Sequence, residues 1–289
     1  MLVYFTKIFI IKRTADVNIL TNFKNLYFNN LNIEEVKNLL SHDIRVKNMF
    51  FCFCHLDKIR KLQLPEIKLN QEKEAVLIEF RYFPHIEFTI RNTIYKLGSE
   101  WSYTVVCGTG NFQLVKQICN NISKNIKIMV YDYENVSWMD YSIFLVDKRL
   151  WQKFKGNKIL IFQEDAFIFN SNIDEFLKYD YIGAVCPWHG ILSVGNGGLS
   201  LRTKDIMIEV IERTVETNAK ILSSIVFEDI FFTDYMKSLK LGTIAPLSEA
   251  EKFSFERIYK NIETFGCHQP WRAMNNWEDY LYQKLLKDL

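Results

Sequence analysis

The chain has 289 residues, of which 48% are hydrophobic and 15% aromatic, so it can build a sizeable core in one large domain or two. Its 36 basic and 34 acidic residues leave a formal net charge of +2 without a long basic block, which argues against a surface for nucleic acid or for an acidic membrane. Six cysteines in a chain of this length do not indicate a disulfide scaffold.

The first residues carry no sign of a membrane anchor or an export signal. Residues 1–11 are apolar but are interrupted by Lys7, and they are too few to span a bilayer. No small-residue cleavage site follows them. We therefore expect no transmembrane segment and a cytoplasmic location.

Residues 1–74 show little that indicates chemistry. Asn32 is expected to cap a helix that runs through Leu40, and residues 48–56 are predicted to form a buried strand. Cys52, Cys54 and His55 could suggest zinc, but no second ligand pair with suitable spacing follows. We predict that residues 1–74 form an accessory region that ends in a polar linker.

From residue 75 onward, short apolar runs alternate with amphipathic stretches. The predicted strands are 75–80, 101–107, 126–131 and 158–162, and the predicted helices between them are 86–97, 112–122 and 141–154. This alternation predicts a mostly parallel sheet with right-handed crossovers. We therefore expect an α/β domain over residues 75–289.

Polar residues interrupt the apolar sequence where the strand 158–162 ends. Gln163, Glu164 and Asp165 stand between two apolar runs. Ligands of open α/β sheets bind beyond the carboxyl ends of the strands, and a carboxylate there can hold a divalent cation. Taken alone, the pattern fits equally well a carboxylate that makes only a surface hydrogen bond.

Three later stretches could contribute to the same site. Residues 194–202 (VGNGGLSLR) hold three glycines, which permit positive φ and a close approach of a ligand, although a simple turn before a strand has the same pattern. Glu228 and Asp229 open a predicted helix, whose dipole favours ionised carboxylates at that end. His268 stands alone between a glycine and a Pro-Trp pair, and a lone histidine is more often structural than a ligand.

Taken together and in order, several short stretches resemble a glycosyltransferase of the GT-A type, in particular a small family of uncharacterised glycosyltransferase-like proteins classed as a domain of unknown function. These stretches are AVLIEFR (75–81), GTGN (108–111), LIFQED (160–165), YIGA (181–184), VGNGGLSLR (194–202), EDIFF (228–232) and GCHQPW (266–271). The resemblance runs from about Ala75 to Trp271. It implies a Rossmann-like GT-A fold and the transfer of a sugar from a nucleotide sugar.

The resemblance also implies a metal site. In GT-A enzymes the last acid of an Asp-x-Asp triplet holds a manganese ion that bridges the donor's diphosphate. Only Asp165 matches that acid, because Gln163 stands where the first acid is expected. His268 matches a late metal-binding histidine of many GT-A enzymes. The expected cofactor is therefore Mn²⁺ or Mg²⁺, held by Asp165 and His268.

The remaining roles follow from the same resemblance. Asp229, with Glu228 as the second choice, is expected to deprotonate the acceptor hydroxyl in an inverting transfer. The residues expected at the donor are Arg81, Asn111, Gln163, Glu164, Gly197 and Gly198. The expected partners are a nucleotide sugar, first of all a UDP-sugar carrying a hexose or an N-acetylhexosamine, and a glycan or protein acceptor.

Two other functions stay open at this stage. The incomplete acidic triplet also fits an inactive GT-A relative that binds glycans or proteins. A nucleotidyltransferase shares a similar sheet but usually needs two metal-binding acids and a basic triphosphate loop, which the sequence does not show.

Overall fold

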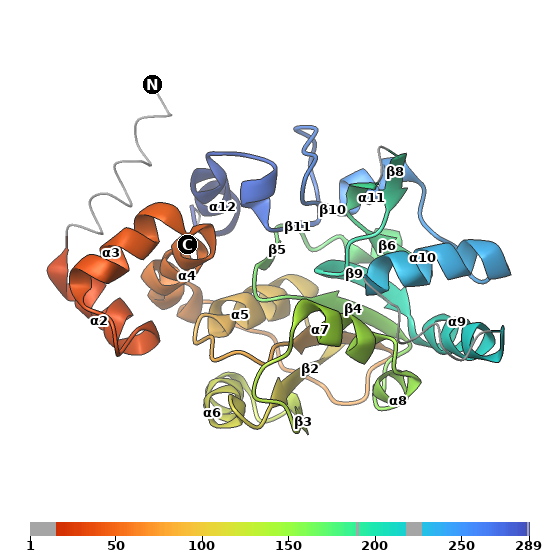
Figure 1. Ribbon diagram of the computed structural model, residues 1–289, viewed down its shortest axis with the longest axis horizontal. Helices are drawn as coiled ribbons and strands as arrows, with labels where there is room; N and C mark the ends of the chain where they lie inside the picture. Colours follow the sequence, from red (N-terminus) through yellow and green to blue (C-terminus); the bar gives the residue numbers. More distant parts are fainter. Residues whose placement is uncertain (1–15, 189–190, 218–226, 288) are drawn as a thin grey trace.

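A central six-stranded sheet organises this computed structural model, which describes residues 16–188, 191–217, 227–287 and 289 (Figure 1). The strand order is β3, β2, β1, β4, β9, β6. The bounds are β1 (Lys73–Ile78), β2 (Trp101–Gly108), β3 (Lys127–Tyr131), β4 (Lys158–Phe162), β6 (Tyr181–Gly183) and β9 (Leu199–Thr203). Strands β3, β2, β1 and β4 pair in parallel, and β9 runs antiparallel to both of its neighbours. The predicted α/β class with a mostly parallel central sheet is therefore confirmed.

Helices connect the parallel strands largely as the sequence predicted. They are α5 (Ile86–Leu97), α6 (Phe112–Ile122), α7 (Trp138–Leu145) and α8 (Lys148–Trp151). The bounds of α5 and α6 agree with the predicted ones. The single helix predicted over 141–154 is wrong, because Asp147 accepts a hydrogen bond from the backbone N–H of Arg149 and starts a new helix there.

Further helices and strands follow β4 in the chain. They are β5 (Ala166–Ile168), η1 (Ile173–Phe176), β7 (Val185–Trp188), β8 (Ile191–Val194), α9 (Lys204–Thr217), α10 (Glu228–Leu239), α11 (Leu247–Phe253), β10 (Ser254–Phe255), β11 (Gly266–His268), η3 (Pro270–Arg272) and α12 (Trp277–Leu285). Strands β10, β11 and β5 form a separate three-stranded sheet, and β7 pairs with β8 as a hairpin.

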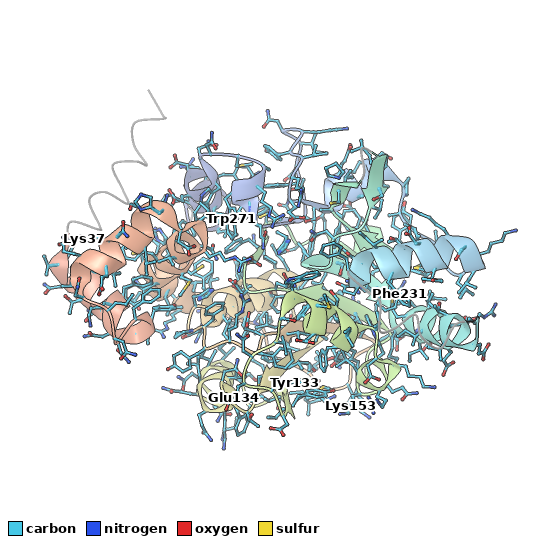
Figure 2. The ribbon with its side chains drawn as sticks, in the orientation of Figure 1. Lys37, Tyr133, Glu134, Lys153, Phe231 and Trp271 are labelled. Atoms are coloured by element: carbon cyan, nitrogen blue, oxygen red, sulfur yellow. The ribbon has the colours of Figure 1, made fainter. Side chains whose placement is uncertain are left out.

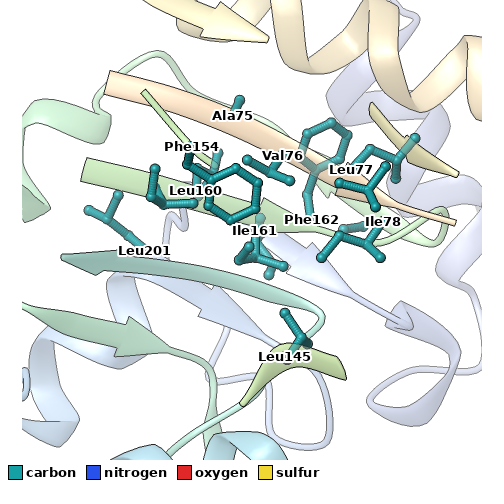
Figure 3. Packing of buried hydrophobic residues seen from close by; sticks show 14 of the residues in the cluster. Ala75, Val76, Leu77, Ile78, Leu145, Phe154, Leu160, Ile161, Phe162 and Leu201 are labelled. Atoms are coloured by element: carbon teal, nitrogen blue, oxygen red, sulfur yellow. The ribbon is translucent and has the colours of Figure 1, made fainter. Parts of the chain in front are cut away.

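The strands β1 and β4 lie in the middle of the main core. Their residues from Ala75 to Ile78 and from Ile159 to Phe162 are almost fully buried, and Leu145, Phe154 and Leu201 pack around them (Figure 3). Helices on both faces bury these strands, which explains why their sequences are apolar runs rather than alternating patterns. The predicted central position of residues 158–162 is confirmed.

The described part of the N-terminal region is mainly helical, and residues 61–72 form neither helix nor strand. It forms α2 (Val17–Tyr27), α3 (Ile33–His42) and α4 (Ile44–Arg60), seen in red and orange in Figure 1. Asn32 caps α3 as predicted, in a capping box with Glu35. The strand predicted over 48–56 is wrong, since these residues lie inside α4.

Helix α4 resembles a strand in sequence because two different clusters bury it. Val46, Met49 and Phe50 pack with α2 and α3. Phe51 and Cys52 belong to a second cluster with residues of α5, β5 and α12. Apolar residues are then needed around most of the helix, and the 3.6-residue periodicity disappears. The division at residue 74 stays a prediction.

No helix within the described ranges is long and apolar enough to cross a membrane. The apolar stretch 1–11, on which the expectations about an anchor and an export signal rested, lies outside those ranges.

Candidate functional site

A cavity of about 700 Å³ opens where strands β1 and β4 end. Its wall includes the residues that follow β1, the residues that follow β4, the turn between β8 and β9, the start of α10, and the end of β11. The predicted site residues on this wall are Arg81, Gln163, Glu164, Asp165, Gly197, Gly198, Glu228, Asp229 and His268. Tertiary folding thus brings nearly the whole predicted set to one place.

The pairing of β5 with β11 brings Asp165 and His268 together. In this antiparallel pair His268 stands opposite Ala166, the residue that follows Asp165. His268 Nε2 lies 3.1 Å from Asp165 Oδ1. Gln269 donates from its side chain to Asp165 Oδ2 over 2.8 Å, and from its backbone N–H to the Asp165 carbonyl over 3.1 Å. Both side chains are buried at the cavity wall, so their expected convergence is present.

The charges of the pair depend on each other. Burial would raise the pKa of Asp165, but the imidazole of His268 and the amide of Gln269 outweigh burial and hold that pKa low, at about 2. Burial would lower the pKa of His268, but the Asp165 carboxylate outweighs it and raises that pKa.

The donor atoms of the pair fit a divalent cation. Asp165 Oδ1 and both ring nitrogens of His268 are buried without a hydrogen bond of good geometry in the described part of the chain. A carboxylate oxygen and an imidazole nitrogen suit Mn²⁺, and Mg²⁺ is commonly held by one or two carboxylates together with substrate phosphates. No group of three or more His, Cys, Asp or Glu side chains within the described ranges is arranged to hold a metal. A cation here would therefore take its remaining ligands from the substrate or water.

Two neighbours restrict the position of His268. A Cβ at Gly198 would overlap the imidazole ring, so the turn between β8 and β9 needs a glycine there. In addition, Glu256 Oε1 lies 3.9 Å from Nδ1 of the ring. Glu256 is buried, pairs with Arg272 at 3.2 Å and accepts a short hydrogen bond from Asn196. Glu256 was not predicted, because nothing in its local sequence distinguishes it.

The glycines of this turn serve close packing rather than an unusual backbone. Among the described glycines, positive φ occurs at Gly98 and Gly242, so the positive φ considered for the VGNGG turn is absent. A Cβ at Gly197 would overlap Glu228 Oε1, much as one at Gly198 would overlap His268. The glycines allow side chains from two other elements to approach the turn.

Glu228 is occupied by a buried ion pair. Arg202 Nη1 donates to Glu228 Oε2 over 2.7 Å, and Nη2 donates to Oε1 over 3.0 Å. The Arg202 side chain is fully buried, and the rings of Trp151, Tyr181 and Phe232 lie 5.0–5.9 Å from its guanidinium carbon. A buried arginine needs an acidic partner, and Glu228 is that partner.

Asp229 faces the cavity and is only partly buried. Burial, together with the negative charge of Glu228, raises its pKa to about 6. The backbone N–H of Ile230 donates to Asp229 Oδ1 over 2.8 Å and opposes this shift. The helix N-terminus was expected to favour the ionised carboxylate, and burial together with the charge of Glu228 acts in the opposite direction and outweighs it.

The start of α10 is held in place by aromatic packing. Phe231, labelled in Figure 2, and Phe232 are buried on the core side of the helix. Phe232 packs edge-on against Trp151 of α8, with ring centroids 5.7 Å apart. This anchor directs the first turn of α10, with Asp229, toward the cavity.

Arg81 and Glu164, both expected at the donor, differ in exposure and in their partners. Arg81 is partly exposed on the cavity wall, where it pairs with Glu79 at 2.6 Å and lies 3.6 Å from Glu164. Glu164 is buried and lies 2.8 Å from His85 Nε2, so it helps to fix the strand end.

Asn111, unlike the other predicted site residues, lies outside the cavity wall. It is almost fully buried, accepts from the backbone of Gly108, and donates to the carbonyls of Glu79 and Arg81 over 2.8 and 2.9 Å. It is not among the residues that line the cavity. Its bonds connect the loop after β2 to the end of β1, and they place Arg81. A direct contact of Asn111 with a donor stays a prediction.

Arg202 ends the stretch VGNGGLSLR (194–202), but no function was predicted for it. Its signal was a charged residue in the segment that follows the glycine-rich turn, because an arginine buried in a strand requires an acid elsewhere in the chain.

Comparison with known proteins finds a family model and similar solved structures. A family model described as "Protein of unknown function (DUF5672)" matches residues 125–268, a stretch that runs from the start of β3 to the end of β11 and lies within the resemblance at 75–271. No curated protein matches the chain.

Among solved structures, the chain is similar to the apo form of the glycosyltransferase GlyE of Streptococcus pneumoniae TIGR4. The sequence identity is 11% and the TM-score is 0.49. The match covers 74% of this chain and 60% of that one, so this chain spans less than two thirds of the structure it matches.

Proposed function

We propose that the protein transfers a sugar from a nucleotide sugar, in the first instance a UDP-sugar carrying a hexose or N-acetylhexosamine, to an acceptor hydroxyl with inversion. One observation carries this proposal. A single cavity at the end of the central strand holds both the Asp165–His268 pair and a carboxylate with a raised pKa, Asp229. Perturbed acids in a cleft at this edge of an α/β sheet are typical of an active site.

Asp165 and His268 are the residues that would hold Mn²⁺ or Mg²⁺. A divalent cation held by these two residues would supply positive charge against the negative charge that builds on the leaving diphosphate. Gln163 precedes Asp165 in the sequence and also lines the cavity, where its amide can donate to the ribose or the diphosphate.

Asp229 acts on the acceptor. Its carboxylate is ionised at neutral pH and takes the proton of the acceptor hydroxyl. As the O–H bond breaks, the acceptor oxygen bonds to the anomeric carbon, and the bond from that carbon to the β-phosphate oxygen breaks. The nucleoside diphosphate leaves with that electron pair. Glu228 stays paired with Arg202 and does not compete for the proton.

A screen of nucleotide sugars tests the proposal. Thermal stabilisation and hydrolysis are measured with and without Mn²⁺ for the wild type, Asp165→Asn and His268→Ala. Asp57→Asn and His42→Ala serve as matched controls, because both residues are exposed and lie outside the cavity. We expect at least one nucleotide sugar to stabilise the wild type and both controls when Mn²⁺ is present and not when it is absent. The same nucleotide sugar should stabilise neither site variant.

The screen also separates the proposal from the inactive relative. That alternative is favoured by Gln163 in place of an acid and by the presence of only two candidate ligands in the described part of the chain. The transferase proposal fails if, at any Mn²⁺ concentration, no nucleotide sugar stabilises the wild type and the wild type hydrolyses none. The inactive relative that binds glycans or proteins then takes its place.

A further inference from the structure

Two aromatic rings stack on each other at the mouth of the cavity. Trp138 is the first residue of α7, and Phe227 immediately precedes α10. Their ring centroids are 5.4 Å apart with an angle of 25° between the planes. Both residues line the cavity, yet Trp138 is 58% exposed and Phe227 is 39% exposed.

The exposed rings of Trp138 and Phe227 are apolar, whereas much of the cavity wall is charged. The wall of the cavity carries charged groups such as Arg81, Asp165 and Asp229. Met139 and Ile143 of α7 are also exposed, so the apolar surface continues along that helix. Large exposed apolar groups beside a polar cleft commonly mark a binding surface, since water solvates them poorly.

A pyranose ring has the chemistry that such a surface binds. One of its faces presents C–H groups that pack on an aromatic ring, while its hydroxyl groups stay in water. A nucleobase could also stack, but in an inverting displacement the nucleoside diphosphate leaves on the side opposite to the attacking hydroxyl. Phe227 is two residues before Asp229, so the stacked pair lies beside the group that would deprotonate the attacking hydroxyl.

We propose that Trp138 and Phe227 form an acceptor subsite that holds a pyranose ring, which makes the acceptor a glycan rather than an unmodified protein side chain. This inference rests on the proposed function, because it places the acceptor next to Asp229. The subsite binds the sugar through stacking and leaves the reacting hydroxyl to Asp229.

Saturation-transfer NMR with defined sugars tests the subsite without a donor sugar. The probes are the methyl β-pyranosides of glucose, galactose and N-acetylglucosamine, together with cellobiose and lactose, all measured in the presence of UDP and Mn²⁺. The proteins are the wild type, Trp138→Ala, Trp138→Phe and Tyr95→Ala. Tyr95 is an exposed aromatic residue of α5 outside the cavity and is the matched control.

We expect at least one probe to bind the wild type with its strongest signals on one face of the pyranose ring. Trp138→Ala should weaken that binding at least 10-fold, Trp138→Phe should weaken it less, and Tyr95→Ala should leave it unchanged. Trp138 is largely exposed, so its replacement should not prevent folding, and circular dichroism checks this.

The inference is overturned if no probe binds the wild type, or if Trp138→Ala binds the probes as tightly as the wild type. It is also overturned if Trp138→Ala weakens only the binding of UDP, because the rings would then hold the nucleobase. Failure of the transferase proposal is distinguishable. In that case no nucleotide sugar is bound or turned over, while the pyranosides still bind through Trp138.

Discussion

Glu228 and Asp229 are neighbours in sequence, but the fold gives them different surroundings. Glu228 is buried against Arg202, within a cage of aromatic rings. Asp229 lies on the cavity wall, and its pKa is raised by burial and by the charge of Glu228. One carboxylate is thus held in a buried ion pair, and the other faces the cavity with a raised pKa.

Replacing Asp229 by Asn should reduce sugar transfer by about 10²–10⁴-fold, because the variant cannot accept the acceptor's proton. Binding of the nucleotide sugar should change little. The control is Asp234→Asn, an exposed acid on the same helix. Transfer is measured at saturating donor, and donor binding is measured separately by calorimetry. Near wild-type transfer in Asp229→Asn would rule out its role as the base.

Transfer should rise with pH, reach half of its maximum near pH 6 and level off about one unit higher, because a base acts only in its ionised form and Asp229 has a pKa of about 6. Glu228 raises this pKa, whereas Arg202 and the N–H groups of Ile230 and Gly197 lower it. Glu228→Gln removes the raising charge, so the inflection should move to lower pH. The quantity measured is the apparent pKa in the pH dependence of kcat/KM, which reports the free enzyme.

Glu228→Gln should also lower the free energy of unfolding by about 3–5 kcal/mol, because Arg202 loses its buried partner. Urea denaturation gives this value, and circular dichroism shows whether the variant is folded before its pH profile is measured. A folded variant with an unmoved inflection would mean that Glu228 does not set the pKa of the base.

At the scale of elements, the turn between β8 and β9 brings parts of the site together. Gly197 and Gly198 have no side chains, so side chains from α10 and β11 can pack closely against them. The backbone N–H of Gln163 donates to the Gly198 carbonyl over 2.9 Å. Strand β11, through its pairing with β5, then sets His268 beside Asp165.

Gly198→Ala should weaken the apparent affinity for Mn²⁺ by about 10–100-fold, because the added Cβ overlaps the His268 ring and displaces a ligand. Gly195→Ala is the matched control in the same turn. Its Cβ would have no neighbour closer than 3.8 Å, and its φ is not in the left-handed region. Mn²⁺ titration by calorimetry compares the two variants, and equal affinities would show that His268 is not a ligand.

At the scale of the whole molecule, the N-terminal helices share a core with the C-terminal end of the chain. The Phe51 ring of α4 lies 6.3 Å from that of Phe88 and 5.9 Å from that of Trp277. Lys58 adds a hydrogen bond of 3.3 Å to Tyr282, and Figure 1 shows α12 close to α4. Arg45 of α4 also lines the cavity, so residues 1–74 contribute to the candidate site.

Phe51→Ala should lower the free energy of unfolding by about 3–5 kcal/mol, because it opens a void between three parts of the chain. The control is Val17→Ala at a largely exposed position. We expect one cooperative transition in urea when tryptophan fluorescence and circular dichroism are followed together. Two separate transitions, with only the first affected by Phe51→Ala, would show that residues 1–74 fold as an independent domain.

The sequence by itself determined the elements whose signals are local. The strand at 158–162, the helices at 86–97 and 112–122, and the cap at Asn32 depend on residues within a few positions of one another. Most of the site residues predicted from the motif order also line the cavity, including Asp165, Asp229 and His268.

Only the tertiary structure decided the properties that depend on distant neighbours. Residues 48–56 form a helix because two clusters bury it, and local periodicity does not show this. Asn111 bonds to the backbone rather than lining the cavity. The raised pKa of Asp229 requires a cavity wall and a charged neighbour. The stacking of Trp138 on Phe227 joins two segments that are far apart in the chain, because α7 and α10 pack side by side.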